Sequence, residues 1–139
     1  MASANLDLVR SIYAAWERGD WSSADWAHPE IEFVVAGGPA PGSSTGVAGM
    51  AKAWGETLSA FRDFRARAEE YRELDDGRVL VLHEWSGRGR TSALSVDRMK
   101  AKSATLFQIR EGKVTKLVAA WDRDRALAEL GLSRKGDSA

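Results

Sequence analysis

The sequence has no cysteine, and this absence excludes a disulfide framework as well as thiol or thiolate-metal chemistry. It has no excess of charge of one sign either, because 20 lysines and arginines balance 20 aspartates and glutamates. A nucleic-acid surface needs clustered basic residues, so we expect no nucleic acid as partner. No apolar run approaches the roughly 20 residues of a membrane span, and the N-terminal residues lack the apolar stretch of a signal peptide. We therefore expect a cytoplasmic protein that does not bind a membrane.

Histidines are scarce too. The chain has two, His28 and His83, and no carboxylate recurs at metal-ligand spacing with either of them. We therefore expect neither a metal site nor a cofactor. His28 precedes Pro29 at a predicted helix-to-strand junction, where its ring would satisfy backbone groups of the turn. That leaves His83 as the histidine to consider for function.

Tryptophan, in contrast, is abundant, with six residues in a chain of 139. Large flat rings supply bulk to a core, and they also line pockets for apolar ligands. For any single tryptophan, a place in the core is the expected role. The six are Trp16, Trp21, Trp26, Trp54, Trp85 and Trp121. A packed aromatic core and an aromatic pocket therefore both stay open.

The pattern of apolar residues predicts helices first and strands later. Apolar residues recur at three- and four-residue spacing over 6–16 and 47–61, which indicates two amphipathic helices. A short helix carrying Trp26 is expected after the first of them. Glycine, proline and serine dominate 36–45, so we expect an irregular loop there, long enough to act as a flap. Strands are predicted over 31–35, 64–74, 78–85, 99–110 and 113–121.

The last third of the chain carries the clearest local signals. Side chains alternate with a period of two from Ala104 to Ile109, as in a half-buried strand. Arg110-Glu111-Gly112 fits a type I turn followed by a glycine bulge, which would join two strands in a hairpin. Asp122 or Asp124 can cap the short helix that follows, and Gly131 can end it. Asp122 also has a second interpretation, as an acid at the rim of a pocket.

Strands that follow helices in the chain indicate an α+β fold. We expect a highly curved antiparallel or mixed sheet wrapped around the N-terminal helices, which makes a cone with a central pocket. Residues 1–132 would form this single domain, and 133–139 a flexible tail. The strand over 103–109 has large apolar side chains on both faces, and one sheet face has no helices of its own. A second copy is the usual cover for such a patch, so we expect a homodimer through that sheet face.

This order of elements and four short motifs resemble a known family. GDW follows the first helix, HPEIEF lies at the first strand, REGKVTKLVAAWDR in the last hairpin, and ALAELGL at the end. With these motifs, residues 6–132 resemble the SnoaL-like branch of the nuclear-transport-factor-two-like superfamily. That superfamily includes ketosteroid isomerase, limonene epoxide hydrolase and polyketide cyclases. The resemblance implies the cone fold, and it implies chemistry only where catalytic positions match.

Two enzymes of the superfamily provide positions to compare. Ketosteroid isomerase uses a tyrosine and two aspartates, and its positions match Ile12, Gly37 and Ala104. Limonene epoxide hydrolase uses an Asp-Arg-Asp set, and its positions match His83, Trp85 and Ala119. Because the acids, bases and donors of both reactions are missing at these positions, the resemblance implies neither activity.

The resemblance also implies which strand residues face the pocket. His83 would be a titratable imidazole among apolar groups, where burial favours its neutral form near neutral pH. It is the candidate catalytic residue, as a general base or as a group that orients a bound carbonyl. The alternative is a core histidine hydrogen-bonded to a neighbour such as Tyr13 or Gln108. With the helix residues that would pack across the sheet, the expected pocket residues are Ile12, Trp16, Phe33, Met50, Trp54, Val79, Val81, His83, Trp85, Ala104 and Ala119.

Three functions stay open at this stage. The first is an isomerase, cyclase or hydrolase that uses His83 on an apolar small molecule such as a polyketide or terpenoid. The second is a ligand-binding protein without catalysis, whose pocket sequesters or senses its ligand. The third is a structural homodimer whose cone is filled by its own rings. Turnover would separate the first from the second, and ligand-dependent stabilisation would separate both from the third.

Overall fold

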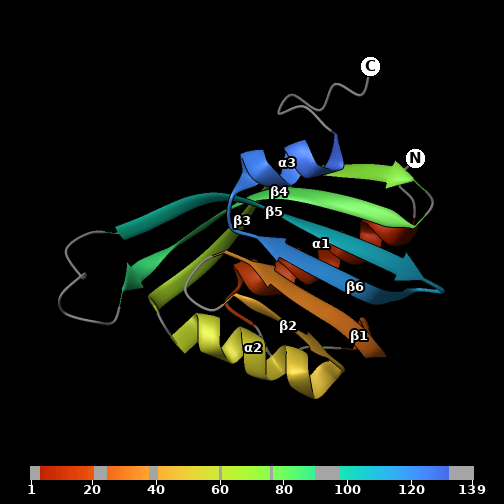
Figure 1. The fold of residues 1–139 in the computed structure, drawn as a ribbon, viewed down its shortest axis with the longest axis horizontal. Helices are drawn as coiled ribbons and strands as arrows, with labels where there is room; N and C mark the ends of the chain where they lie inside the picture. Colours follow the sequence, from red (N-terminus) through yellow and green to blue (C-terminus); the bar gives the residue numbers. More distant parts are fainter. Residues whose placement is uncertain are drawn as a thin grey trace.

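The computed structural model of the chain describes residues 4–20, 25–37, 41–59, 61–75, 77–89 and 98–131. Within these ranges the chain forms three helices and six strands (Figure 1). In chain order they are α1 (Ala4–Glu17), β1 (Ala27–Ala36), β2 (Gly42–Thr45), α2 (Val47–Ser59), β3 (Phe61–Asp75), β4 (Arg78–Gly89), β5 (Arg98–Arg110), β6 (Lys113–Ala120) and α3 (Arg123–Leu130). The predicted tail over 133–139 lies outside the described ranges.

The six strands form one mixed sheet in the order β2-β1-β6-β5-β4-β3. Adjacent strands are antiparallel except β1 and β6, which run parallel although they come from opposite parts of the chain. The sheet curves, and its edge strands β2 and β3 do not pair, so it does not close into a barrel (Figure 1). This architecture confirms the predicted α+β fold with a curved mixed sheet.

The two long helices follow their apolar spacing. α1 buries Val9, Ile12, Tyr13 and Trp16, which recur every three or four residues on one side of the helix. It ends before Gly19, whose φ of 84° a residue with a β-carbon rarely adopts. α2 ends at Ser59, so residue 61 of the predicted second helix instead begins β3. No helix in the described ranges is long and apolar enough to cross a membrane.

The first strand is longer than predicted, and the predicted loop after it is partly ordered into a strand. β1 begins at Ala27, so His28 and Pro29 lie inside the strand and do not separate a helix from it. Trp26 lies in a turn that leads directly into β1, while 21–24 of the predicted short helix are outside the described ranges. Gly42–Thr45 of the predicted flap pairs with β1 as β2, because a polar edge strand needs backbone partners on one side only.

The hairpin between β5 and β6 differs from the predicted turn type. Arg110 pairs directly with Lys113, which leaves a two-residue loop in place of three residues with a bulge. Both loop residues have positive φ, 52° at Glu111 and 78° at Gly112. Two positive φ angles define a type I′ turn, whose twist matches that of the flanking strands. The prediction of a hairpin at this place is therefore correct, and its turn type was wrong.

The two faces of the sheet pack against different helices. Alternate residues of β4, such as Val81 and Trp85, face α1 and α2 and belong to the larger hydrophobic cluster. Their neighbours Leu80 and Leu82 face the other way and pack against Leu127 of α3. We call the side of α1 and α2 the inner face and the side of α3 the outer face. Apart from Ala104, the strand residues predicted to line the site lie on the inner face.

Candidate functional site

Aromatic rings fill the space between the inner face and the two long helices. Trp16 of α1 lies 4.9 Å from Tyr13 and 5.4 Å from Trp54 of α2, measured between ring centroids. Trp54 in turn lies 5.5 Å from Phe33 and 6.0 Å from Trp85. These distances are those of direct edge-on and tilted contact. The structure therefore brings these predicted pocket residues together, and Ile12, Met50, Val79, Val81 and Ala119 share their cluster.

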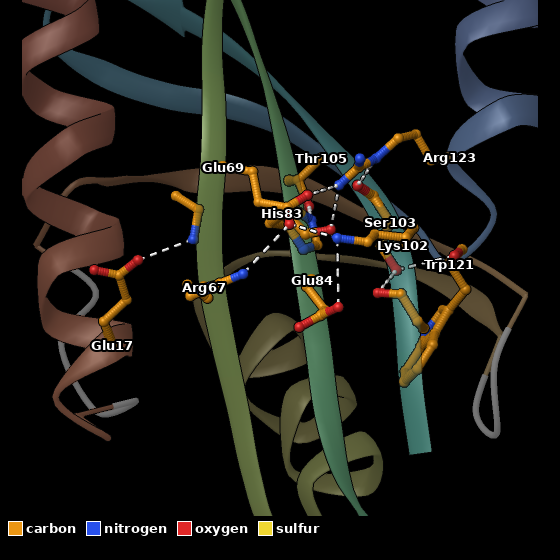
Figure 2. Close-up of polar contacts among 12 residues, drawn as sticks. Glu17, Arg67, Glu69, His83, Glu84, Lys102, Ser103, Thr105, Trp121 and Arg123 are labelled. Atoms are coloured by element: carbon orange, nitrogen blue, oxygen red, sulfur yellow. Dashed lines mark hydrogen bonds and ion pairs between the residues drawn. The ribbon is translucent and has the colours of Figure 1, made fainter. Parts of the chain in front are cut away.

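His83 is a polar group inside this aromatic cluster. Its side chain is completely buried, and its Nε2 lies 2.7 Å from the Thr105 hydroxyl oxygen (Figure 2). Its ring centroid is 4.6 Å from that of Trp85 and 5.7 Å from that of Tyr13. Burial, helped by the nearby positive charge of Arg123, lowers the pKa of His83 to about 3. The imidazole is therefore neutral at pH 7, and its partner is Thr105 rather than Tyr13 or Gln108.

The second ring nitrogen of His83 sets what the residue can do. Nδ1 is buried and has no hydrogen-bond partner among the described residues. If Nε2–H donates to Thr105, Nδ1 carries a free lone pair and can accept a proton. If the Thr105 hydroxyl donates to Nε2, Nδ1 carries the hydrogen and can donate to a carbonyl oxygen. The direction of the hydrogen bond between His83 and Thr105 therefore decides whether Nδ1 accepts or donates.

Tyr13 is a second polar group in the interior, and the sequence analysis assigned it no functional role. Its hydroxyl is buried and reaches hydrogen-bond geometry with no described residue. Burial raises the pKa of Tyr13 well above its ordinary value, and the nearby Thr105 hydroxyl only partly opposes this rise. Tyr13 therefore stays protonated as a donor. The indole nitrogen of Trp85 is likewise buried without a described partner. The sequence signal that could have identified Tyr13 is its place on the buried stripe of α1.

Ala104 does not belong to this site, which corrects the position expected from the family resemblance. It pairs with Leu82 across the sheet and packs on the outer face under α3. Its neighbours Ser103 and Thr105 are the ones that pair with inner-face residues. Successive residues of a strand point to opposite faces, so an alignment that is wrong by one residue places every side chain on the wrong side.

Two further residues singled out from the sequence have local roles. Asp122 Oδ1 accepts a hydrogen bond from the Arg125 backbone N–H at 3.2 Å and caps α3, while Gly131 ends that helix with a φ of 72°. His28 Nδ1 accepts from the backbone N–H of Glu30 at 3.0 Å, so it satisfies the backbone as expected. Among the described residues, no three histidine, aspartate or glutamate side chains gather closely enough to hold a metal ion.

The surface hollows include three that are lined by described residues. One of about 490 Å³ lies beside the first turn of α3, and one of about 540 Å³ lies along β3, β4 and β5. The third, about 230 Å³, lies between the end of α1 and the start of β3, and Trp16 and Phe64 form part of its wall. His83, Tyr13 and Thr105 line none of the three. The third hollow nevertheless touches the interior rings from outside.

A network of charged side chains lies on the outer face of the sheet, on the opposite side from the His83 ring (Figure 2). Glu69 of β3 forms ion pairs with Lys102 at 2.5 Å and with Arg123 at 2.6 Å. Partial desolvation alone would raise the pKa of Glu69, but these two cations hold it below its usual value. The sequence carries no local signal for this network, because its members come from distant parts of the chain.

Comparison of the sequence with known protein families identifies the family of this chain. The sequence matches the family model described as a SnoaL-like domain over residues 9–117. None of the curated proteins compared with the chain matches it.

Many solved structures share the fold. An NTF2-like protein of unknown function from Burkholderia pseudomallei is 16% identical, with a TM-score of 0.74, and the match covers 91% of this chain and 97% of that one. A putative polyketide cyclase from Xanthomonas campestris pv. campestris is 18% identical, with a TM-score of 0.69 and coverage of 91% and 96%. TerC, co-crystallised with polyporic acid, is 23% identical, with a TM-score of 0.68 and coverage of 92% and 98%. At these identities the likeness shows the fold alone.

Proposed function

Since the chain belongs to the SnoaL-like domain family, we propose that its cone binds a small, flat, largely apolar molecule through His83. The observation that carries the proposal is a set of buried polar atoms with no described partner. Nδ1 of His83, the hydroxyl of Tyr13 and the indole nitrogen of Trp85 all lie among aromatic rings. Leaving a buried polar atom unpaired costs about 1–3 kcal/mol. A ligand oxygen bound there would relieve that cost.

The ligand class follows from the lining. Rings on several sides suit a planar polyketide- or terpenoid-like molecule, and the few polar atoms suit one carbonyl or hydroxyl group on it. TerC, co-crystallised with polyporic acid, and the putative polyketide cyclase share the fold, which supports this choice.

The reaction we propose for the bound ligand is an isomerisation, cyclisation or hydrolysis assisted by His83. A neutral imidazole with Nε2–H directed to Thr105 can accept a proton at Nδ1. Tyr13, which stays protonated, can donate to the oxygen that gains charge. Access would run through the hollow beside Trp16 and Phe64, because these two residues line it and also belong to the interior cluster.

A thermal-shift screen tests this function. Wild-type protein is heated with steroids, lactones, epoxides or aromatic polyketides, and His83→Gln and His28→Gln are treated in the same way. We expect one class to raise the melting temperature of the wild type and of His28→Gln, and to raise that of His83→Gln much less. If no class stabilises the wild type, or if His83→Gln responds like the wild type, the proposal is wrong. Turnover of the stabilising class would separate an enzyme from a protein that only binds.

A second function, a structural protein with a filled cone, is favoured by one observation. The interior rings already touch, with Trp85 and Trp121 only 4.5 Å apart between centroids. In that case the polar atoms of the interior serve no ligand, and every compound in the screen would leave the melting temperature unchanged.

For both the ligand-binding and the filled-cone function, the partner that we propose is a second copy of the chain. The sequence predicted a sheet face without helices of its own, and this expectation was wrong. α3 covers Leu80, Leu82 and Ala104 on the outer face. Leu106 and Leu74, which pack against this cluster, are only partly buried. We propose that a second copy covers this remaining surface. A monomer in sedimentation at concentrations on the order of tens of micromolar would contradict the proposal.

A further inference from the structure

Arg123 lies on the opposite side of the sheet from the His83 ring and contacts the same pair of strands. Its Nη2 donates to the carbonyl oxygen of His83 at 2.8 Å, and its Nε donates to the carbonyl oxygen of Ser103 at 3.1 Å (Figure 2). His83 and Ser103 are direct partners across β4 and β5. One planar guanidinium therefore holds both members of a cross-strand pair, and the compact ammonium of a lysine lacks the fork that does so.

The guanidinium is itself held in place. Nη2 of Arg123 also donates to Glu69 Oε1 at 2.6 Å, and only 17% of the Arg123 side chain is exposed. Glu69 is the extra residue of a bulge in β3, between the pairs Ala68–His83 and Glu70–Leu82. A bulge interrupts regular pairing and redirects a side chain. Here the interruption lies next to His83, and the redirected carboxylate meets Arg123.

Other contacts hold the same strand pair from its sides. The Ser103 hydroxyl donates to the carbonyl oxygen of Trp121 at 2.9 Å, which ties β5 to the start of the α3 segment. Lys102, next to Ser103, pairs with both Glu69 and Glu84. The backbone that carries His83 is thus fixed by charged groups of the outer face and by the Ser103 hydroxyl, which lies on the inner face like the His83 ring.

We propose that Arg123 is a positioning residue for His83, which fixes the His83–Ser103 pair from outside so that the imidazole meets Thr105 inside. The direction of a strand side chain follows from its backbone, so two anchored carbonyls fix where the ring lies. This inference deepens the proposed function and rests on it for its biological meaning. The positive charge of Arg123 also helps to keep the ring neutral.

The test is the state of the two histidine rings in Arg123→Met, read by long-range proton–nitrogen correlation spectra without any ligand. We expect the His83 ring nitrogens to shift, with a changed proportion of the two tautomers and a raised titration midpoint. The His28 ring should keep its wild-type signals and serves as an internal reference. Arg125→Met is the matched control, because Arg125 lies on the same helix and its side chain is 80% exposed. Its spectra should equal those of the wild type.

Two results would overturn the proposal. One is a folded Arg123→Met protein whose His83 signals equal those of the wild type, since a merely structural arginine would change stability alone. If Arg123→Met does not fold, Arg123→Lys is measured instead. His83 signals equal to those of the wild type in Arg123→Lys would also overturn the proposal. Glu69→Gln should change the proportion of the two tautomers in the same direction by a smaller amount. It should not raise the titration midpoint, because the charge of Glu69 raises the pKa of His83. Because no ligand is present, this result is independent of the thermal-shift screen, which tests the function of the cone separately.

Discussion

The Nε2 atom of His83 and the hydroxyl oxygen of Thr105 lie 2.7 Å apart, on adjacent strands and within an aromatic interior. The two residues are not direct cross-strand partners, because Thr105 pairs with Val81 and His83 with Ser103. Their contact is diagonal, on the inner face of the sheet. Both side chains are buried, so each provides the hydrogen bond that the other would otherwise obtain from water.

Removal of the Thr105 hydroxyl should destabilise the fold. Thr105→Val keeps the shape of the side chain and leaves a ring nitrogen of His83 without its partner, so we expect the free energy of unfolding to fall by about 1–3 kcal/mol. Urea denaturation measures this change. Thr105→Ser should retain most of the stability. Thr115→Val, which removes an exposed 3.3 Å bond to Gln108, should change it by less than about 0.5 kcal/mol. A Thr105→Val protein as stable as the wild type would contradict the assigned hydrogen bond.

Stability should depend on pH through His83. Burial, and secondly the charge of Arg123, lowers the folded-state pKa from 6.5 to about 3. The unfolded chain therefore binds more protons between these values, and the free energy of unfolding falls as the pH falls below 6.5, by up to about 1.4 kcal/mol per pH unit.

The range between pH 6.5 and 4.5 isolates this effect, because Glu69, whose pKa lies below its ordinary 4.5, loses its contribution only at lower pH. Urea denaturation across this range measures the slope. His83→Gln should remove most of it, whereas His28→Gln should keep it. An unchanged slope in His83→Gln would show that another group is responsible.

The cap of α3 should be separable from any role of Asp122 in ligand binding. Asp122→Ala removes the side-chain acceptor of the Arg125 N–H, so we expect a loss of about 1 kcal/mol in the free energy of unfolding. Asp122→Asn keeps an acceptor oxygen and should restore most of that stability in thermal or urea denaturation. If Asp122→Asn is as stable as the wild type but loses the response to a stabilising ligand, Asp122 acts at the rim of the pocket.

Two glycines should respond to alanine in opposite ways. Gly112 has a φ of 78° in the turn between β5 and β6, so Gly112→Ala should cost about 1–2 kcal/mol through the left-handed backbone alone. Gly55 lies within α2, and an added β-carbon there would meet nothing within 4 Å. Gly55→Ala should therefore gain about 0.5–1 kcal/mol. Melting temperatures measured side by side check both signs, and a fall with Gly55→Ala would contradict the described helix.

Local features were predictable from the sequence. The buried stripe of α1, the capping aspartate of α3 and its terminal glycine depend on residues within about four positions of one another, and such patterns are visible in a sequence. The turn after β5 shows the limit of this reasoning. Glu111 has a φ of 52°, although glutamate has no particular preference for the left-handed region. The type of this turn therefore could not be predicted from its residues.

Long-range features were not predictable in the same way. Ala104 was assigned to the inner face, and a shift of one residue along β5 was enough to make that assignment wrong. Arg123 and Glu69 are 54 residues apart in the sequence, and neither has a neighbour that signals the other. The bulge that redirects Glu69 also leaves no clear pattern, because the charged residues of β3 alternate on both sides of it.

The parallel pairing of β1 with β6 has a consequence for how the protein is made. β1 has β2 as its local neighbour, and β3, β4 and β5 follow one another as antiparallel neighbours. The strand that joins these two groups, β6, follows all the other described strands in the chain. Until Lys113–Ala120 has emerged, the nascent chain holds two separate strand groups, each with an unpaired edge. Completion of the sheet therefore waits until β6 has been synthesised, and the aromatic interior cannot be enclosed before it.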